Sequence, residues 1–492
     1  MYGALALAFS LVAGACGDSS SESDGDTDAD TSSSTSDPAN TTAGTAGNTG
    51  TAGPGGTMTG GMTTGDGDGD GDGDGDGDGD GDGDGDGDGD GDGDGDGDGD
   101  GDGDGDGDGD GDGDGDGDGD GDADVCPPEP QEVTFAYIWI ANSSEGTVSK
   151  IRTEDGFTEA KYRTGPNQGA QPSRTSVNQY GDVAVSNRDP SSVTKISAVL
   201  SRCVDKNNNG MIDTSQGLND VLPWGEDECV VWHHDIPNNG AFQGGARATA
   251  WEGTTQDQET CETPVPRLWV GYRDNGQVVH ILRLDGDTGE VLDDVPINNW
   301  NASGWAPYGG AVNSAGDFIT TGYNNERGIR VDAETLEVID LGFSPDNYKY
   351  GMGVDQNGNA WVGSFSGPHN LYFYDMQAQQ WEGLGNGGGS ILGVAIDGEG
   401  RVWGAGTGPC RLVEADVETK TFTNTNIALP GCGSPWGVSV DNEGFIWVVD
   451  KANQAFKVDP DTYNVELVVT ELVGPYTYSD MTGQGLQLVI IQ

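Results

Sequence analysis

A unit of about 42 to 45 residues recurs through most of this sequence, and it restricts the fold more than any other feature. It is clearest in PWGVSVDNEGFIWVVDKANQAFKVDPDTYNVE (435–466) and ILGVAIDGEGRVWGAGTGPCRLVEADVETKTFT (391–423). Each copy has four short β-type runs separated by turn signals such as Asp-x-x-Gly, in which glycine supplies the positive φ of a tight hairpin. The pattern predicts four strands per unit.

Alignment on the second strand gives seven copies, at Trp139, Ala184, Trp269, Ile319, Trp361, Trp403 and Trp447. Their spacings are 45, 85, 50, 42, 42 and 44 residues, and the longest contains an insertion at about 201–230. This period predicts an all-β fold, a seven-bladed β-propeller of four-stranded blades over residues 125–492. We expect the recurrent tryptophans to pack between blades rather than to bind a ligand.

Ring closure is also predicted. The first copy, FAYIWIAN (135–142), begins at its second strand, and the segment PYTYSDMTG (475–483) matches a first strand. The C-terminal segment should therefore complete blade 1, which would remove an exposed sheet edge. The pattern assigns no place to residues 486–492.

The units GVAIDGEGRVWG and GVSVDNEGFIWVVD resemble the NHL and streptogramin lyase (virginiamycin B lyase) group of propellers, over roughly residues 131–483. The resemblance implies the propeller fold. The lyases of that group use Mg²⁺ and a His/Glu cluster on one face to open a cyclic peptide by elimination. The four histidines here, His233, His234, His280 and His369, fall in separate settings and do not match that cluster. We therefore expect no catalytic residues.

The N-terminal sequence MYGALALAFSLVAGAC resembles a bacterial lipoprotein signal. Ala4 to Ala15 forms an apolar core of 12 residues, too short to span a bilayer, and AGAC resembles a lipobox. We expect a signal peptide at 1–15 and lipidation of Cys16. The absence of Lys or Arg before the core departs from the pattern, and an ordinary cleaved signal with an incidental cysteine is the alternative.

A Ser/Thr/Gly-rich stretch (16–64) and a Gly-Asp segment (65–124) follow, and the latter contains 29 uninterrupted Gly-Asp pairs. The Gly-Asp run has no apolar side chain to bury, and the stretch before it has no periodicity, so we expect a long disordered N-terminal tether. An uncharged Gly-rich chain of the length of the Gly-Asp run would span about 40–45 Å, and repulsion between carboxylates would extend it. The layout resembles bacterial surface lipoproteins with Gly-Asp-rich linkers. A weak collection of Ca²⁺ by the carboxylates is a secondary interpretation.

Charge excludes one class of partner. Residues 1–124 hold 37 of the 85 acidic residues and no Lys or Arg, which leaves 48 acidic and 21 basic residues, a net charge of −27, in the remaining 368. An acidic surface disfavours phosphate backbones, so we expect no nucleic-acid partner.

Cysteine usage indicates export. Lipidation of Cys16 would leave six cysteines, an even number suited to disulfides in an oxidising compartment. In a propeller, the turns after strands one and three share one face, and the turns after strands two and four share the other. Cys410 and Cys432 fall on the latter face and should pair. Among the remaining four, Cys203–Cys229 is preferred, which would leave Cys126–Cys261.

The insertion contains a calcium-type loop, CVDKNNNGMIDTSQG (203–217). Asp205, Asn207, Asn209 and Asp213 occupy positions 1, 3, 5 and 9 of an EF-hand order, with glycine at position 6 and the Met211 carbonyl at position 7. Position 12 is Gln216 instead of glutamate, so the missing carboxylate would come from Asp220, Glu226, Asp227 or Glu228. We expect a structural Ca²⁺ site, and a plain Asn-rich turn is the alternative.

The face that carries Cys410 and Cys432 also carries loops rich in aromatic residues, asparagine and arginine. Stacking and hydrogen bonding are supplied together there, which suits a sugar or a peptide. The predicted ligand-binding residues are Tyr308, Tyr350, Trp436, Tyr476, Arg273 and Arg327. The alternative is that these loops contain only turn-forming residues.

Together these features predict a monomeric, exported lipoprotein anchored to the bacterial outer membrane or cell surface. Its propeller would bind a glycan, a peptide or a surface protein. A streptogramin lyase-like or lactonase-like enzyme is the alternative, and a purely structural spacer is a third interpretation.

Overall fold

The structure is a computed structural model that describes Cys126 and residues 133–490, except 239–241, 275–277, 301–304, 306, 325–326 and 346–347. The predicted signal peptide (1–15), the tether (16–64) and the Gly-Asp segment (65–124) lie outside the described residues, as does Cys16. All described residues belong to one compact unit.

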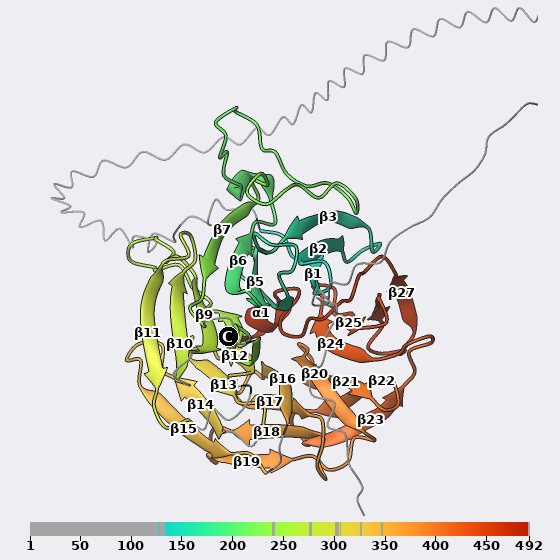
Figure 1. The fold of residues 1–492 in the computed structure, drawn as a ribbon. Helices are drawn as coiled ribbons and strands as arrows, with labels where there is room; N and C mark the ends of the chain where they lie inside the picture. Colours follow the sequence, from blue (N-terminus) through green and yellow to red (C-terminus); the bar gives the residue numbers. More distant parts are fainter. Residues whose placement is uncertain are drawn as a thin grey trace, which may run out of the picture. The chain divides into compact units, whose positions relative to one another are not determined.

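The described residues form six antiparallel sheets, and the eight-stranded one consists of two four-stranded blades joined by a single pair, Ser364 with Ile391. The seven resulting blades are arranged in a ring (Figure 1). Blade 1 contains β1 (Tyr137–Asn142), β2 (Thr147–Arg152) and β3 (Thr158–Arg163). Blade 2 contains β4 (Pro172–Val177), β5 (Val183–Arg188), β6 (Ser191–Ile196) and β7 (Val230–Asp235). Blade 3 contains β8 (Thr249–Trp251), β9 (Arg267–Arg273), β10 (Val279–Asp285) and β11 (Val291–Ile297). Blade 4 contains β12 (Gly309–Val312), β13 (Phe318–Thr321), β14 (Arg327–Val331) and β15 (Val338–Phe343).

Blade 5 contains β16 (Lys349–Val354), β17 (Ala360–Ser364), β18 (Leu371–Asp375) and β19 (Gln380–Gly383). Blade 6 contains β20 (Ser390–Ile396), β21 (Arg401–Thr407), β22 (Arg411–Asp416) and β23 (Thr421–Ile427). Blade 7 contains β24 (Pro435–Val440), β25 (Ile446–Asp450), β26 (Gln454–Val458) and β27 (Val465–Val469). The prediction of a seven-bladed β-propeller is therefore confirmed.

The C-terminal segment closes the ring as the sequence predicts. The amide of Trp139 donates to the carbonyl of Met481 (2.9 Å), and the amide of Tyr476 donates to the carbonyl of Ala141 (2.9 Å). Pro475 also forms a β-bridge with Asn142. The segment thus lies along β1 and takes the place of the first strand of blade 1.

The residues that follow form a short helix, α1 (Gln484–Ile490), near the centre of the ring in Figure 1. Leu486 lies against Val312, Val354, Ile396 and Val440, which end the inner strands of blades 4 to 7. The helix therefore covers the end of the central channel where the inner strands finish. The repeat pattern could not predict this, because the helix occurs once.

A buried aspartate–tryptophan hydrogen bond recurs in blades 5, 6 and 7. The turn aspartate accepts the indole N–H of the second-strand tryptophan, from Trp361 to Asp355 (2.8 Å), from Trp403 to Asp397 (2.9 Å) and from Trp447 to Asp441 (2.9 Å). The other carboxylate oxygen of Asp441 accepts the backbone N–H groups of Glu443 (3.0 Å) and Phe445 (2.9 Å). One carboxylate therefore fixes both the turn and the ring.

The tryptophans pack between blades, as predicted. Trp447 of blade 7 is fully buried and shares a hydrophobic cluster with Ile138 and Ile140 of blade 1. Trp403 of blade 6 likewise packs with Val438 of blade 7.

A second recurrent contact joins neighbouring blades. A lysine or arginine of the third strand donates to a backbone carbonyl that follows the third strand of the next blade. These bonds run from Lys150 to Ala198 (2.8 Å), from Lys195 to Gly286 (2.9 Å), from Arg283 to Ala333 (2.6 Å) and from Lys457 to Thr153 (2.9 Å). The last of them links blade 7 to blade 1 and reinforces the closure.

Three disulfides are present, Cys126–Cys261, Cys203–Cys229 and Cys410–Cys432, and these are the pairs that the sequence favours. Disulfides persist in oxidising compartments, so they indicate an exported protein. Within the described part of the chain, no helix has the length and apolar character needed to cross a membrane.

The Asp441 carboxylate should be a major contributor to stability. Asp441→Ala would leave the indole N–H of Trp447 and the amide of Phe445 without a partner, and each buried unpaired donor costs about 1–3 kcal/mol. We expect denaturant titration of the full chain to show a loss of about 2–6 kcal/mol in the free energy of unfolding.

Asp461→Ala is the matched control, because the Asp461 side chain is 81% exposed and contacts only an arginine, Arg401. Its loss should stay below about 1 kcal/mol. Equally small losses for both variants would contradict the role given to Asp441.

Candidate functional site

Aromatic side chains gather where the inner strands begin, at the end of the central channel opposite α1. Tyr350 and Trp436 lie near the starts of β16 and β24, and Tyr308 directly precedes β12. We call the whole set the aromatic cluster. It contains buried Tyr308, Tyr323, Tyr350, Leu392, Trp436, Tyr476 and Tyr478, with the partly exposed Trp305, Tyr348 and Phe365 packed against them.

The aromatic cluster is held by hydrogen bonds as well as by ring contacts. The indole N–H of Trp436 donates to the Tyr350 hydroxyl (2.8 Å), and that hydroxyl is also hydrogen-bonded to the hydroxyl of Tyr476. The rings of Tyr350 and Trp436 meet edge to face at 5.6 Å. These three residues come from blades 5, 7 and 1, so the cluster joins distant parts of the chain.

Four cations surround these rings. The guanidinium of Arg174 lies 3.0 Å from the ring centroid of Tyr478, and that of Arg188 lies 4.4 Å from the centroid of Tyr476. Arg247 lies 5.0 Å from the ring of Trp305, and the Lys451 ammonium lies 4.4 Å from the ring of Trp436. Cation–π contacts at these distances are attractive, most strongly where water is excluded.

The three arginines are buried, with exposed fractions of 0% for Arg174, 2% for Arg188 and 0% for Arg247. Burial lowers the pKa of the Arg174 guanidinium to about 10, and the charge of Arg247 acts in the same direction. Arg174 therefore remains protonated at neutral pH. Positive charge is thus concentrated at one end of the channel of an acidic domain.

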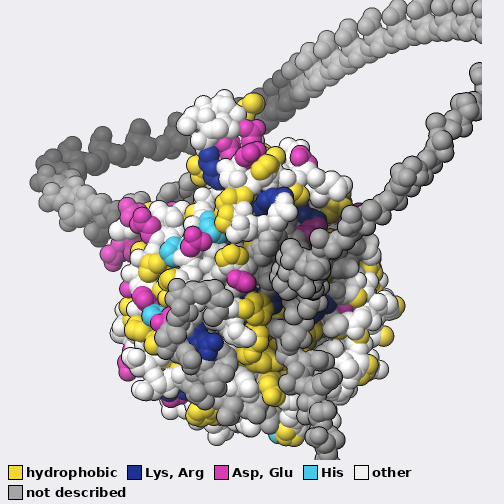
Figure 2. Space-filling view, viewed as in Figure 1, with side chains coloured by type: hydrophobic (Ala, Val, Ile, Leu, Met, Phe, Trp, Pro, Cys, Tyr) yellow, Lys and Arg dark blue, Asp and Glu magenta, His cyan; other side chains and the backbone are white. Residues whose placement is uncertain are grey.

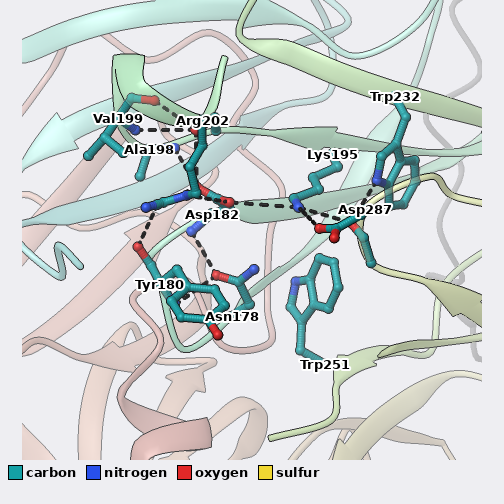
Figure 3. A network of polar contacts seen from close by, with 12 residues as sticks. Asn178, Tyr180, Asp182, Lys195, Ala198, Val199, Arg202, Trp232, Trp251 and Asp287 are labelled. Carbon is teal, nitrogen blue, oxygen red and sulfur yellow. Dashed lines mark hydrogen bonds and ion pairs between the residues drawn. The ribbon is translucent and has the colours of Figure 1, made fainter. Parts of the chain in front are cut away.

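A buried ionic network in blade 2 shows how this fold otherwise satisfies charge (Figure 3). The buried Asp182 carboxylate accepts hydrogen bonds from Arg202 (2.8 Å) and from the amide of Ala198 (2.8 Å), and Lys195 lies 3.8 Å from it. Lys195 also lies 3.8 Å from Asp287 of blade 3. Every charge drawn there has an opposite charge beside it, so this network is structural.

The structure places the six predicted ligand-binding residues in two groups. Tyr308, Tyr350, Trp436 and Tyr476 come together, but they are buried rather than arranged as an exposed rim. Arg327 pairs instead with Asp340 (2.6 Å) on the outer strands. Arg273 ends β9, where its backbone carbonyl approaches Gly244.

Sequence reasoning missed Arg174 and Arg247 as members of this site, and it placed Arg188 and Lys451 in loops of the same face without including them in the predicted ligand-binding set. A signal was present for two of them. Arg174 pairs with β5 in the register in which Gly437 pairs with β25, and Arg247 precedes β8 where an aromatic residue stands in other copies. In the alignment of the repeats, blades 2 and 3 therefore differ from the other copies, because a cation stands at the start of the inner strand.

The histidines do not form one centre. His233 and His234 belong to β7 and His280 to β10, whereas His369 precedes β18. His280 is hydrogen-bonded to Asp294 (2.7 Å) and stacks on Tyr272. Within the described residues, no three His, Cys, Asp or Glu side chains are grouped so as to hold a metal ion.

The insertion begins after β6 and contains a short 3₁₀ helix, η1 (Leu200–Arg202), before the predicted calcium loop. Figure 2 shows acidic side chains on this projecting segment. Asp205 accepts the amides of Asn209 (3.2 Å) and Gly210 (2.9 Å). Gly210 has a φ of +83°, which permits the sharp turn expected at position 6.

The side chains of the loop converge on Asp213. The side-chain amides of Asn207 (2.8 Å) and Asn209 (3.0 Å) both donate to one oxygen of its carboxylate. The set Asp205, Asn207, Asn209 and Asp213 offers carboxylate and amide oxygens, which suit Ca²⁺ once the amides turn their oxygens inward. The assignment of a Ca²⁺ site to these residues, with the Met211 carbonyl at position 7, is a proposal.

Two of the four acidic residues considered for position 12 have other partners. Glu228 accepts the amides of Lys206 (2.8 Å) and Asp213 (2.8 Å), and Asp227 accepts the amide of Ser215 (3.0 Å). Asp220 and Glu226 line the same hollow as Asn207 and Asp213. They are therefore the better candidates for the missing carboxylate.

No protein-family model and no curated protein matches the chain. Solved structures similar to it include a catalytically inactive virginiamycin B lyase from Staphylococcus aureus with quinupristin, at 12% identity and a TM-score of 0.45, over 63% of this chain and 87% of that one. Apo AztD from Citrobacter koseri is similar at 11% identity and a TM-score of 0.45, over 69% and 96% of the two chains. The similarity to a streptogramin lyase propeller is thus found among solved structures.

Ca²⁺ is expected to stabilise the insertion. At a free concentration of about 100 times Kd, a bound ion contributes about 2.7 kcal/mol. Thermal unfolding of the full chain should therefore shift to lower temperature when a chelator replaces Ca²⁺. Asp205→Ala should remove the difference, and Asp220→Ala should weaken it.

Asp287→Ala is a control outside the loop and should keep the full response to Ca²⁺. If the chelator leaves the unfolding temperature of the wild-type chain unchanged, the loop is a turn that binds no cation.

Proposed function

We propose that this protein is a membrane-tethered extracytoplasmic lipoprotein whose propeller binds a glycan, a peptide or a surface protein. The observation that carries the binding role is the aromatic cluster with its four surrounding cations. Aromatic rings and arginines are enriched where proteins bind ligands tightly, because they combine apolar area with directional donors. The fold itself does not require this clustering of positive charge.

Binding is favoured over catalysis by the chemistry of the cluster. Elimination needs a general base within reach of the substrate proton, and a group that stabilises developing charge. Arginines at neutral pH are protonated and cannot act as bases. The described histidines lie in blades 2, 3 and 5 and do not share a centre. The sequence alone is the basis for the other parts of the proposal, which are the tether, the lipid anchor and the outer-membrane or cell-surface location.

Lipid anchoring through Cys16 is tested by metabolic labelling with a fatty-acid analogue. The wild-type chain should become labelled and move to the membrane fraction, because the lipobox cysteine is the acceptor. Cys16→Ser should remain unlabelled. Equal labelling of both chains would reject the anchor, whereas protein level and propeller folding should not differ between them.

Ligand binding is tested by probing arrays of glycans, peptides and surface proteins with the full chain. We expect retention on a defined subset, and we expect Lys451→Ala to weaken it at least tenfold, because Lys451 covers the rings of Trp436 and Tyr476. Lys420→Ala is the control, since Lys420 covers Phe373 and pairs with Asp375 at 3.0 Å.

The same preparation should leave a streptogramin B and simple lactones intact in the presence of Mg²⁺. Turnover that disappears on substitution of His280 or His369 would replace the binding role with the lyase-like or lactonase-like alternative. Absence of retention on all arrays would reject the binding role without supporting that alternative.

A further inference from the structure

The cations of the aromatic cluster differ from most other cations of the domain in their partners. Twelve of the 21 Lys and Arg residues form ion pairs with carboxylates, for example Arg202 with Asp182 and Arg283 with Asp293. Across the described ranges, no carboxylate forms an ion pair with Arg174, Arg188 or Lys451. Acidic residues are abundant in this domain, so their absence from one location stands out.

Donor atoms at this location are buried without partners. They are Nε and Nη2 of Arg174, Nε of Arg188 and the hydroxyl of Tyr478. Arg174 uses only Nη1, which donates to the carbonyl of Ser173 (3.0 Å). A buried donor without a partner costs about 1–3 kcal/mol, and more when it is charged. The arrangement is therefore incomplete as it stands.

The arginine donors belong to side chains that lie against two neighbouring rings. Arg174 stands over Tyr478, Arg188 stands over Tyr476, and the rings of Tyr476 and Tyr478 are 5.6 Å apart. The charge of Arg247 lowers the pKa of Arg174, because like charges repel in a medium of low dielectric constant. An anion placed among them would satisfy the open donors and relieve the repulsion together.

Another buried arginine on the same face shows that the fold can satisfy a guanidinium without an anion. Arg411 is 1% exposed, and it donates to the carbonyls of Gly387 (2.7 Å), Pro409 (2.7 Å) and Thr425 (3.0 Å). Burial alone therefore does not leave arginine nitrogens unpaired in this domain. Arg174 and Arg188 lack such a set of acceptors.

We propose that Arg174 and Arg188 bind the carboxylate group of an organic anion at the aromatic cluster. The inference rests on the proposed binding function and names the chemistry of its ligand. Nε and Nη2 lie on one edge of a guanidinium, and this edge matches the two oxygens of a planar carboxylate. The surrounding rings exclude water and contact the apolar body of the ligand.

A carboxylate is favoured over a phosphate by the cost of burial. Transfer of charge from water into a site lined by rings is expensive, and the cost grows with the charge that is transferred. A monoanion needs less compensation than a dianion. Acidic sugars and peptide or aryl acids all present such a carboxylate, so the experiment must separate these sources.

The test measures the ligand-induced shift in unfolding temperature of the full chain with paired probes. Phenylacetate is compared with phenylacetamide, which has the same shape without the charge, and glucuronate is compared with glucose. Inorganic phosphate is the third probe. We expect a saturable shift with at least one carboxylate and none with its neutral partner. The carboxylate that binds more tightly identifies an acidic sugar or an aryl or peptide acid as the source.

Arg174→Gln and Arg188→Gln should each weaken that binding at least tenfold. Arg411→Gln is the matched control, because it removes a buried arginine that already has carbonyl acceptors, and the shift should persist. The shift is measured within each variant, so a change in basal stability does not obscure it. If Arg174→Gln fails to fold, Arg188→Gln alone decides.

The inference is overturned if no carboxylate shifts the wild-type chain, if both arginine variants keep the wild-type affinity, or if phosphate binds more tightly than both carboxylates. If the chain binds a neutral ligand on the arrays and this binding requires Lys451, the proposed binding function stands although the inference of a carboxylate ligand fails. Loss of both array retention and carboxylate binding would reject the two together.

Discussion

The ring depends on how the blades that contain the buried tryptophan satisfy the polar edge of its indole. In blades 5 to 7 a turn aspartate accepts the indole N–H, and the same carboxylate holds the backbone amides of its turn. Because the tryptophan then packs on the next blade, one carboxylate couples the hairpin to the interface. The third-strand cations that reach carbonyls of the following blade act in the same direction around the ring. Local turn chemistry and ring assembly are thus satisfied by the same residues.

Blades 2 and 4 lack the tryptophan, with Ala184 and Ile319 at its position, and their turn aspartates pair with cations but accept no indole N–H of a described tryptophan. Asp182 pairs with Arg202 and Lys195, and Asp317 lies 3.6 Å from Arg330. In blade 2 the ion pair also fixes the start of the insertion, since Arg202 ends η1.

The sequence predicted the fold well because the repeat samples the same hairpin seven times. The gathering of Tyr308, Tyr350, Trp436 and Tyr476 was also predictable, since each precedes or begins an inner strand and these strands start at one face. The burial of these four side chains could not be predicted, because it depends on contacts among blades 1, 4, 5 and 7. Arg174 and Arg247 were missed because they replace the repeat's usual residue, and a consensus hides such positions. Helix α1 occurs once, so no repeat pattern in the sequence could predict it.

Propeller geometry explains why the unpaired charge lies where it does. Seven inner strands run in the same direction around one axis, so the first residues of all of them converge on a small area. Most copies place glycine or an aromatic residue there, which leaves few acceptors among the side chains. An arginine introduced into such a strand meets rings instead of carboxylates, unlike Arg202 in η1 or Arg283 near the end of β10. The positive charge can then be satisfied only by backbone carbonyls, as at Arg411, or by a ligand that brings its own negative charge.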